Sequence, residues 1–139
     1  MRAVMMREFG PPDVLELVEV DRPVPVEGEV LVRVEAVGLN PVDAAVRSGG
    51  FRLFAQPPTV LGWDVAGVVE EAGPGVDRFV PGDRVFGLAR FPRMAGAYAE
   101  YLTVPAAELA RPPAALGGGA IWTMTRPSAA GPSSSAWTS

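Results

Sequence analysis

The alternation of apolar and polar residues predicts short strands along most of the first hundred residues. Two of these segments flank Gly10, Pro11 and Pro12, which indicates a turn and an antiparallel pair. A glycine or a proline-rich stretch interrupts the pattern between most of the others, as expected at turns. The expected strands outside the central apolar run cover residues 1–9, 14–20, 29–37, 84–88 and 97–104.

Residues 58–73 form an apolar run that is rich in β-branched side chains. Gly62 and Gly67 interrupt the run, and Asp64 lies between them. A glycine inside a strand marks a bulge or a close approach of backbones. The run therefore predicts a curved central strand, and a barrel strand with no chemical role remains an open interpretation.

Residues 40–47 lose the strand pattern and predict one short helix. Asn40 is a favourable N-cap, and Pro41 suits the first helical position. Asp43 in the first turn complements the helix dipole. Ser48 and the two following glycines end the helix after about two turns.

Many short strands with glycine and proline turns and one brief helix indicate a mostly β domain. The expected fold is a partly open antiparallel β-barrel with one or two short helices. The pattern ends near Arg111, beyond which proline, glycine and serine are frequent and no acidic residue follows Glu108. This change predicts a domain over residues 1–110 and an irregular, disordered tail over residues 111–139.

The composition of the chain excludes several classes of function. The chain has 139 residues, the length of about one domain. Its net charge is −4, which argues against a nucleic-acid surface. The chain contains no Cys and no His, which excludes disulfides, Cys or His metal ligands and a histidine base. No apolar run has the length of a membrane span and no signal peptide is visible, so a cytoplasmic protein is expected.

The sequence offers no phosphate-binding turn for a dinucleotide. Such a turn needs closely spaced glycines between a strand and a helix. Gly73 and Gly75 begin the spacing, but Arg78 stands where the third glycine belongs. The three glycines at 117–119 follow no expected strand. No Rossmann domain is therefore expected within this chain.

Asn40 and Asp64 each have two possible roles that the sequence does not decide between. Asn40 suits a hydrogen-bond donor at a site, and it suits a helix cap equally well. Asp64 suits a buried carboxylate paired with an arginine, or an exposed barrel residue. Tyr98 and Tyr101 read as half-buried strand aromatics.

Three motifs in order carry a family resemblance. The chain resembles the medium-chain dehydrogenase/reductase superfamily, and within it the zinc-independent quinone oxidoreductase branch. The resemblance covers roughly residues 1–113. Its motifs are Gly62, Asp64, Gly67 and Val69, then residues 81–85, then residues 96–101.

This resemblance implies a GroES-like fold without bound zinc. Zinc-dependent relatives place a cysteine ligand at the position of Asn40 and a histidine ligand at the position of Trp63. Neither side chain found here can replace a thiolate or an imidazole at zinc. No metal site is therefore expected.

The resemblance also implies which residues meet a cofactor and a substrate. Asn40 and Asp43 would be the catalytic residues, and Asn40, Val42 and Asp43 would contact NADPH or NADH. Asn40 would donate a hydrogen bond beside the nicotinamide, and Asp43 would hold the cleft in shape. Many quinone reductases have a cofactor-contacting tyrosine shortly after this aspartate, where this chain has Ala45.

Two functions follow as hypotheses. In the first, the chain is the truncated N-terminal, substrate-side domain of an NAD(P)H-dependent reductase of quinones or enones, from a family whose full-length members can form homodimers. It would be inactive alone because the cofactor domain is missing. In the second, it is a non-catalytic β-barrel that acts at most as a binding or structural module.

Overall fold

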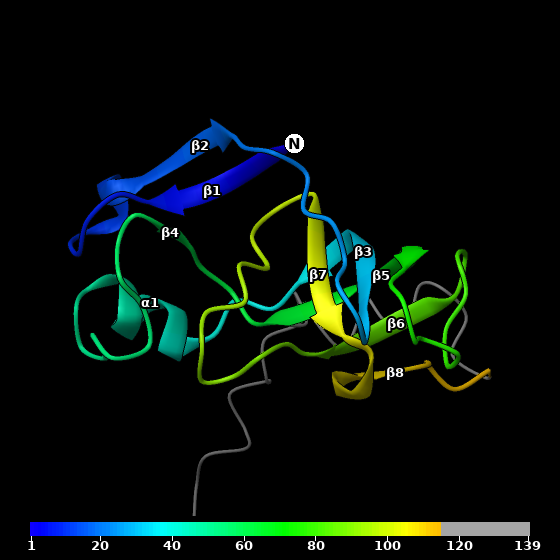
Figure 1. The fold of residues 1–139 in the computed structure, drawn as a ribbon. Coiled ribbons are helices and arrows are strands. Elements are labelled where there is room, and N and C mark those ends of the chain that lie inside the picture. Colours follow the sequence, from blue (N-terminus) through cyan, green and yellow to red (C-terminus); the bar gives the residue numbers. More distant parts are fainter. Residues whose placement is uncertain (115–139) are drawn as a thin grey trace, which may run out of the picture.

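The computed structural model describes residues 1–114, which fold into two antiparallel sheets and one α-helix (Figure 1). The smaller sheet and the helix lie on the left of this view, and the larger sheet lies on the right. Most of the predicted tail, residues 115–139, lies outside the described residues. No helix within residues 1–114 is long and apolar enough to cross a bilayer.

The smaller sheet has three strands in the order β2-β1-β4. β1 (Arg2–Met6) and β2 (Leu15–Glu19) pair antiparallel through a connection that contains the 3-10 turn η1 (Pro12–Val14), as the sequence predicts. β4 (Thr59–Val60) adds a short antiparallel pairing to the other edge of β1.

The larger sheet has five strands in the order β7-β3-β5-β6-β8, and every pairing in it is antiparallel. The strands β3 (Glu29–Val37) and β6 (Arg84–Leu88) have the bounds predicted from the sequence. A second 3-10 turn, η2 (Ala106–Glu108), leads into the last strand. The strands are β3 (Glu29–Val37), β5 (Asp64–Ala72), β6 (Arg84–Leu88), β7 (Tyr101–Pro105) and β8 (Leu109–Ala110).

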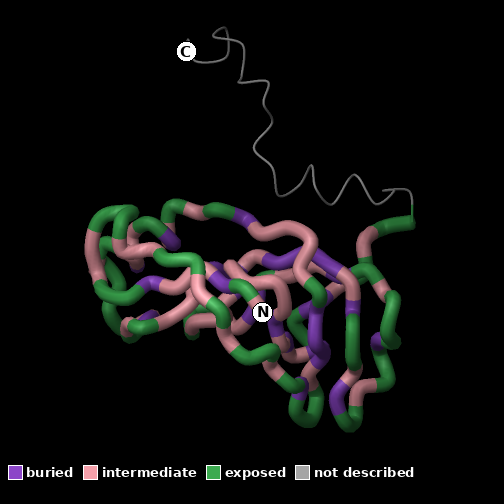
Figure 2. Tube along the Cα trace, turned by 90° about the horizontal axis from the view of Figure 1, so that it is seen from above, coloured by how far each residue is buried: buried purple, intermediate pink, exposed green. Residues whose placement is uncertain are grey.

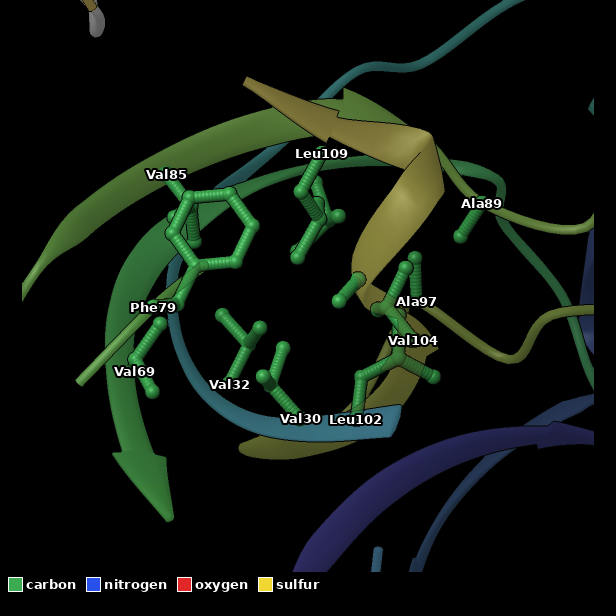
Figure 3. Close-up of a cluster of buried hydrophobic side chains, with 12 residues drawn as sticks. Val30, Val32, Val69, Phe79, Val85, Ala89, Ala97, Leu102, Val104 and Leu109 are labelled. Carbon is green, nitrogen blue, oxygen red and sulfur yellow. The ribbon is translucent and has the colours of Figure 1, made fainter. Parts of the chain in front are cut away.

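The larger sheet curls around its own apolar core, and this curl is the open barrel predicted from the sequence (Figure 3). Alternate residues of β3 point inward, and a ring from the loop before β6 fills the centre. β7 buries alternate residues, as a strand with one buried face does, whereas β3 and β5 each bury three consecutive residues. The labelled core residues are Val30, Val32, Val69, Phe79, Val85, Ala89, Ala97, Leu102, Val104 and Leu109.

The helix α1 (Pro41–Arg47) follows β3 after three residues and packs on a second apolar cluster. This cluster lies between the helix and the smaller sheet, and it includes Met6, Val46, Ala55, Leu61 and Trp63. In a perpendicular view the buried positions follow the middle of the molecule, and the loops at its edges are largely exposed (Figure 2). The helix is therefore held by packing, since seven residues are too few for an isolated helix.

The central run 58–73 is two strands and not one. The chain breaks at Gly62, whose φ of 97° lies in the left-handed region. β4 therefore joins the smaller sheet, and β5 joins the larger one. The prediction of a close backbone approach is confirmed at Gly67, where an added Cβ would lie 2.1 Å from the carbonyl oxygen of Arg33.

The strand predicted over 97–104 is also wrong at its start, because β7 begins only at Tyr101. Two of the preceding residues, Ala97 and Tyr98, bond to partners that lie outside the larger sheet. Ala97 and Tyr98 donate their N–H groups to the carbonyl oxygens of Gly62 and Leu61, at 3.1 and 3.0 Å. The carbonyl oxygen of Tyr98 accepts from Val4 at 2.8 Å, so this segment links the two sheets.

Candidate functional site

Asn40 lies at the junction of β3 and α1, where it is the N-cap residue of the helix. Its side-chain amide donates to Oδ2 of Asp64 at 2.8 Å. The second N–H of the amide makes no hydrogen bond within residues 1–114. The side chain is half-buried, so one oriented donor remains accessible at the start of the helix.

Asp43 is the one charged residue among residues 1–114 that is buried, with 6% of its surface exposed. Its Oδ2 accepts the backbone N–H of Asn40 at 2.8 Å. The backbone N–H of Asp43 donates in turn to the carbonyl oxygen of Asn40 at 3.0 Å. These two bonds fix the first turn of α1, and no group within residues 1–114 forms a hydrogen bond with Oδ1 of the same carboxylate.

Asp64 begins β5 and reaches Asn40 because Gly38 has no side chain. A Cβ at Gly38 would lie 2.4 Å from Oδ2 of Asp64, so any other residue there would displace the carboxylate. Asp64 accepts its hydrogen bond from Asn40 and forms no ion pair with an arginine of the described chain. The interpretation of Asp64 as an arginine partner is therefore wrong.

Tyr98 completes the cluster. It is half-buried, as expected from the sequence, but it does not lie in a strand. Its ring lies against Gly62, where an added Cβ would meet Cδ1 at 2.6 Å. Burial raises the pKa of Tyr98 above its ordinary range, and the neighbouring carboxylates of Asp43 and Asp64 raise it further. The phenol therefore stays neutral, although no partner within residues 1–114 meets its hydroxyl in ordinary hydrogen-bond geometry.

Asn40, Asp43 and Tyr98 border a hollow of about 190 Å³ at the start of α1. Its floor is polar at Asn40 and Asp43, and its other walls are largely apolar. The guanidinium of Arg47 donates to the carbonyl oxygen of Gly10 at its edge. Leu15, Leu39 and Tyr98 separate this hollow from an apolar groove of about 540 Å³ beside β1 and β3.

The remaining predicted positions lie away from this hollow. Val42 is half-buried and packs on the cluster beneath the helix. Trp63 has 1% of its surface exposed, and its indole N–H donates to the carbonyl oxygen of Arg93 at 2.8 Å. Within residues 1–114 no three His, Cys, Asp or Glu side chains gather in a metal-binding group.

The arrangement suits recognition of a carbonyl group and not nucleophilic catalysis. An amide N–H held by a carboxylate is an oriented, uncharged donor. An apolar hollow with a few convergent polar groups is the usual form of a small-molecule site. Sequence reasoning paired Asn40 with Asp43 but missed Asp64 and Tyr98, because both reach the site through contacts distant in sequence.

The comparisons with known proteins define the class of this domain. The family of alcohol dehydrogenase GroES-like domains matches residues 26–114, and the chain belongs to this family. The quinone oxidoreductase of Lama guanicoe is 45% identical over 102 residues, which are 73% of this chain and 30% of that protein. The chain thus spans about 30% of the length of the curated relatives it matches.

Solved structures of quinone oxidoreductases are similar to this chain in both sequence and fold. The Escherichia coli quinone oxidoreductase complexed with NADPH matches with a TM-score of 0.73 and 34% identity, covering 83% of this chain and 34% of that one. The Coxiella burnetii quinone oxidoreductase has the same TM-score and identity, covering 80% and 36%. The GroES-like fold implied by the sequence motifs is therefore confirmed.

Proposed function

We propose that this chain forms the substrate-side domain of a zinc-independent, NAD(P)H-dependent reductase that acts on quinones or enones. The observation that carries the proposal is the Asn40 amide, which Asp64 orients at 2.8 Å and which keeps one N–H free within residues 1–114. Relatives named as quinone oxidoreductases, one of them solved with NADPH, support the same class.

The residues present fit the nicotinamide end of the cofactor. The hollow beside Asn40 joins largely apolar walls to a few polar groups, a combination that suits a flat ring with a polar substituent. We propose that Asn40 and Asp43 contact this end of the cofactor, and that Val42 contributes to cofactor binding indirectly, through the packing of α1. Residues 1–114 contain no strand–glycine turn–helix unit for the pyrophosphate.

The chain's own residues would contribute positioning and polarisation. Bound NAD(P)H supplies the hydride. The free N–H of Asn40 donates to the acceptor oxygen of the substrate and stabilises the negative charge that develops there. Asp64 holds the amide in that orientation, and Asp43 holds the backbone beneath it. The apolar walls restrict the entry of water.

A titration of the 139-residue chain tests how much of the cofactor site it holds. Two or three hydrogen bonds of about 0.5–1.5 kcal/mol each do not exceed an association cost of at least about 4 kcal/mol. We therefore expect NADPH to bind this chain more weakly than about millimolar, and we expect no quinone reduction. A micromolar dissociation constant in calorimetry would show that the chain holds more of the site than proposed.

A chimera tests the activity itself. Residues 1–114 would replace the matching part of the Escherichia coli quinone oxidoreductase, and quinone-dependent NADPH oxidation would be measured. We expect activity that Asn40→Ala lowers by about tenfold to a thousandfold, the range for a lost donor to a developing oxyanion. An inactive chimera with an intact fold would favour the non-catalytic module.

The control is Asn40→Ser, because serine is also a good N-cap but its short side chain does not place an amide N–H in the hollow. Under the proposal, Asn40→Ser is as inactive as Asn40→Ala. Recovery of activity with serine would mean that Asn40 acts only as a helix cap.

A further inference from the structure

Two buried polar side-chain atoms within residues 1–114 lack a hydrogen-bond partner, and both belong to residues that border the hollow at the start of α1. One is Oδ1 of Asp43, an acceptor, and the other is the hydroxyl of Tyr98, a donor. A buried polar group without a partner is destabilising, so two such atoms at one hollow are unexpected. A hydroxyl donor and a carboxylate acceptor are chemically complementary, so the two groups can act together.

The ring of Tyr98 has little freedom to move away. Its backbone is tied on both sides, because its N–H donates to Leu61 at 3.0 Å and its carbonyl oxygen accepts from Val4 at 2.8 Å. The face of the ring lies on Gly62, a position with a φ of 97° and no room for a Cβ. The backbone of the two sheets therefore fixes where the phenol lies on the hollow that Asp43 also borders, and the Asp43 carboxylate is close enough to raise the pKa of the phenol.

The Asp43 carboxylate transmits this position to Asn40. Its Oδ2 accepts the backbone N–H of Asn40 at 2.8 Å, so its plane cannot rotate without weakening that bond. A Tyr98 hydroxyl that donates to Oδ1 would restrict the rotation of the Asp43 carboxylate at its second oxygen as well. Asn40 is then fixed twice, through its backbone by Asp43 and through its side chain by Asp64.

We propose that Tyr98 is a positioning residue of this site: its hydroxyl holds the Asp43 carboxylate, which in turn holds Asn40 with its free amide N–H toward the hollow. The importance of this arrangement for catalysis rests on the proposed reductase function. The physical link between Tyr98 and Asn40 does not, and it is tested without any turnover.

The test is amide hydrogen exchange and NMR on the 139-residue chain. Tyr98→Phe keeps the ring on Gly62 and removes only the hydroxyl. We expect the Asn40 backbone N–H to exchange about five- to tenfold faster, the effect of weakening one hydrogen bond. The side-chain amide signals of Asn40 shift with it, while amides of the β3–β5 ladder keep their rates.

The matched control is Tyr101→Phe, which alters the other tyrosine, whose ring lies under the guanidinium of Arg22 at 4.2 Å. We expect no change at Asn40 in this variant. Unchanged exchange and unchanged amide signals at Asn40 in Tyr98→Phe would overturn the proposal. An equal loss of protection across the whole chain would also overturn it, because that pattern indicates a general loss of stability.

A second variant keeps the test decisive if Tyr98→Phe folds poorly. Asp43→Asn retains an oxygen for the Asn40 N–H but replaces one carboxylate oxygen with an amide group. If the two residues act together, the effects of Asp43→Asn and Tyr98→Phe on Asn40 exchange are not additive in the double variant. Additive effects would overturn the link, whereas an inactive chimera would overturn only the reductase function.

Discussion

Glycines decide where the polar side chains of the site can lie. Gly62 has a φ of 97° and supports the Tyr98 ring, and Gly38 leaves space for the Asp64 carboxylate. A left-handed φ costs a residue with a Cβ about 1–2 kcal/mol, and a clash in a packed site adds about 1–3 kcal/mol. Gly62 combines both costs, and Gly82 offers the matched comparison because its φ is the same but its surroundings are open.

We expect Gly62→Ala to lower the free energy of unfolding by about 2–5 kcal/mol, as strain and overpacking add. Gly82→Ala should lower it by only about 1–2 kcal/mol, since nothing lies within 4 Å of the added Cβ. Urea denaturation of both variants measures the difference. Equal losses would mean that the Tyr98 ring moves away from Gly62 at little cost.

The raised pKa of Tyr98 predicts a loss of stability in alkali. In the unfolded chain the phenol ionises near its ordinary pKa of about 10, while in the folded chain it stays protonated. Above about pH 10 the unfolded state therefore binds fewer protons, and the free energy of unfolding falls as pH rises toward the folded pKa.

Urea titrations between about pH 8 and pH 11 measure this fall, in a window where the chain has no lysine or cysteine to titrate. We expect the fall to be smaller in Tyr98→Phe and to persist in Tyr101→Phe. The same slope in all three proteins would show that the Tyr98 hydroxyl is not confined as described.

Two ion pairs join segments of the larger sheet, and they differ in how far they are buried. Arg90, after β6, donates to Oε1 of Glu29 at 2.5 Å and to the carbonyl oxygen of Thr103 at 3.0 Å. It thereby joins the loop after β6 to β3 and β7. Arg84 on β6 pairs with Glu35 on β3 at 2.8 Å, but closer to solvent.

We expect Arg90→Ala to lower the free energy of unfolding by about 2–4 kcal/mol, because it leaves a poorly solvated carboxylate without its partner. The Glu29 side chain is only 14% exposed in this pair. Arg84→Ala is the control and should cost about 0–1 kcal/mol, as exposed pairs do. The prediction fails if urea denaturation gives the two variants the same midpoint.

The whole chain lacks the side chains with which proteins of this superfamily hold zinc, since it contains no Cys and no His. We expect elemental analysis of the purified, dialysed chain to find no stoichiometric zinc, because amide and indole groups are poor zinc ligands. One equivalent of zinc per chain would contradict the zinc-independent assignment. A carboxylate-only site would then be the place to search, beginning with Asp43 and Asp64.

The strand pattern, the helix and the branch of the superfamily could all be predicted before the structure. β3, β6 and α1 lie where their local patterns place them, because each depends on alternation, turn residues or a cap within a few positions. Asn40 and Asp43 were chosen together through the family resemblance, and their contact is also a local one, since the first turn of a helix brings positions three apart together.

Contacts between distant segments decided the rest. The break at Gly62 sends β4 and β5 to different sheets, and the crossing at Tyr98 delays the start of β7, although both segments look locally like continuous strands. Asp64 meets Asn40, 24 positions away, and Tyr98 lies beside Asp43 only because two sheets meet there. Local patterns encode which face of a strand is buried, but packing selects which buried groups become neighbours.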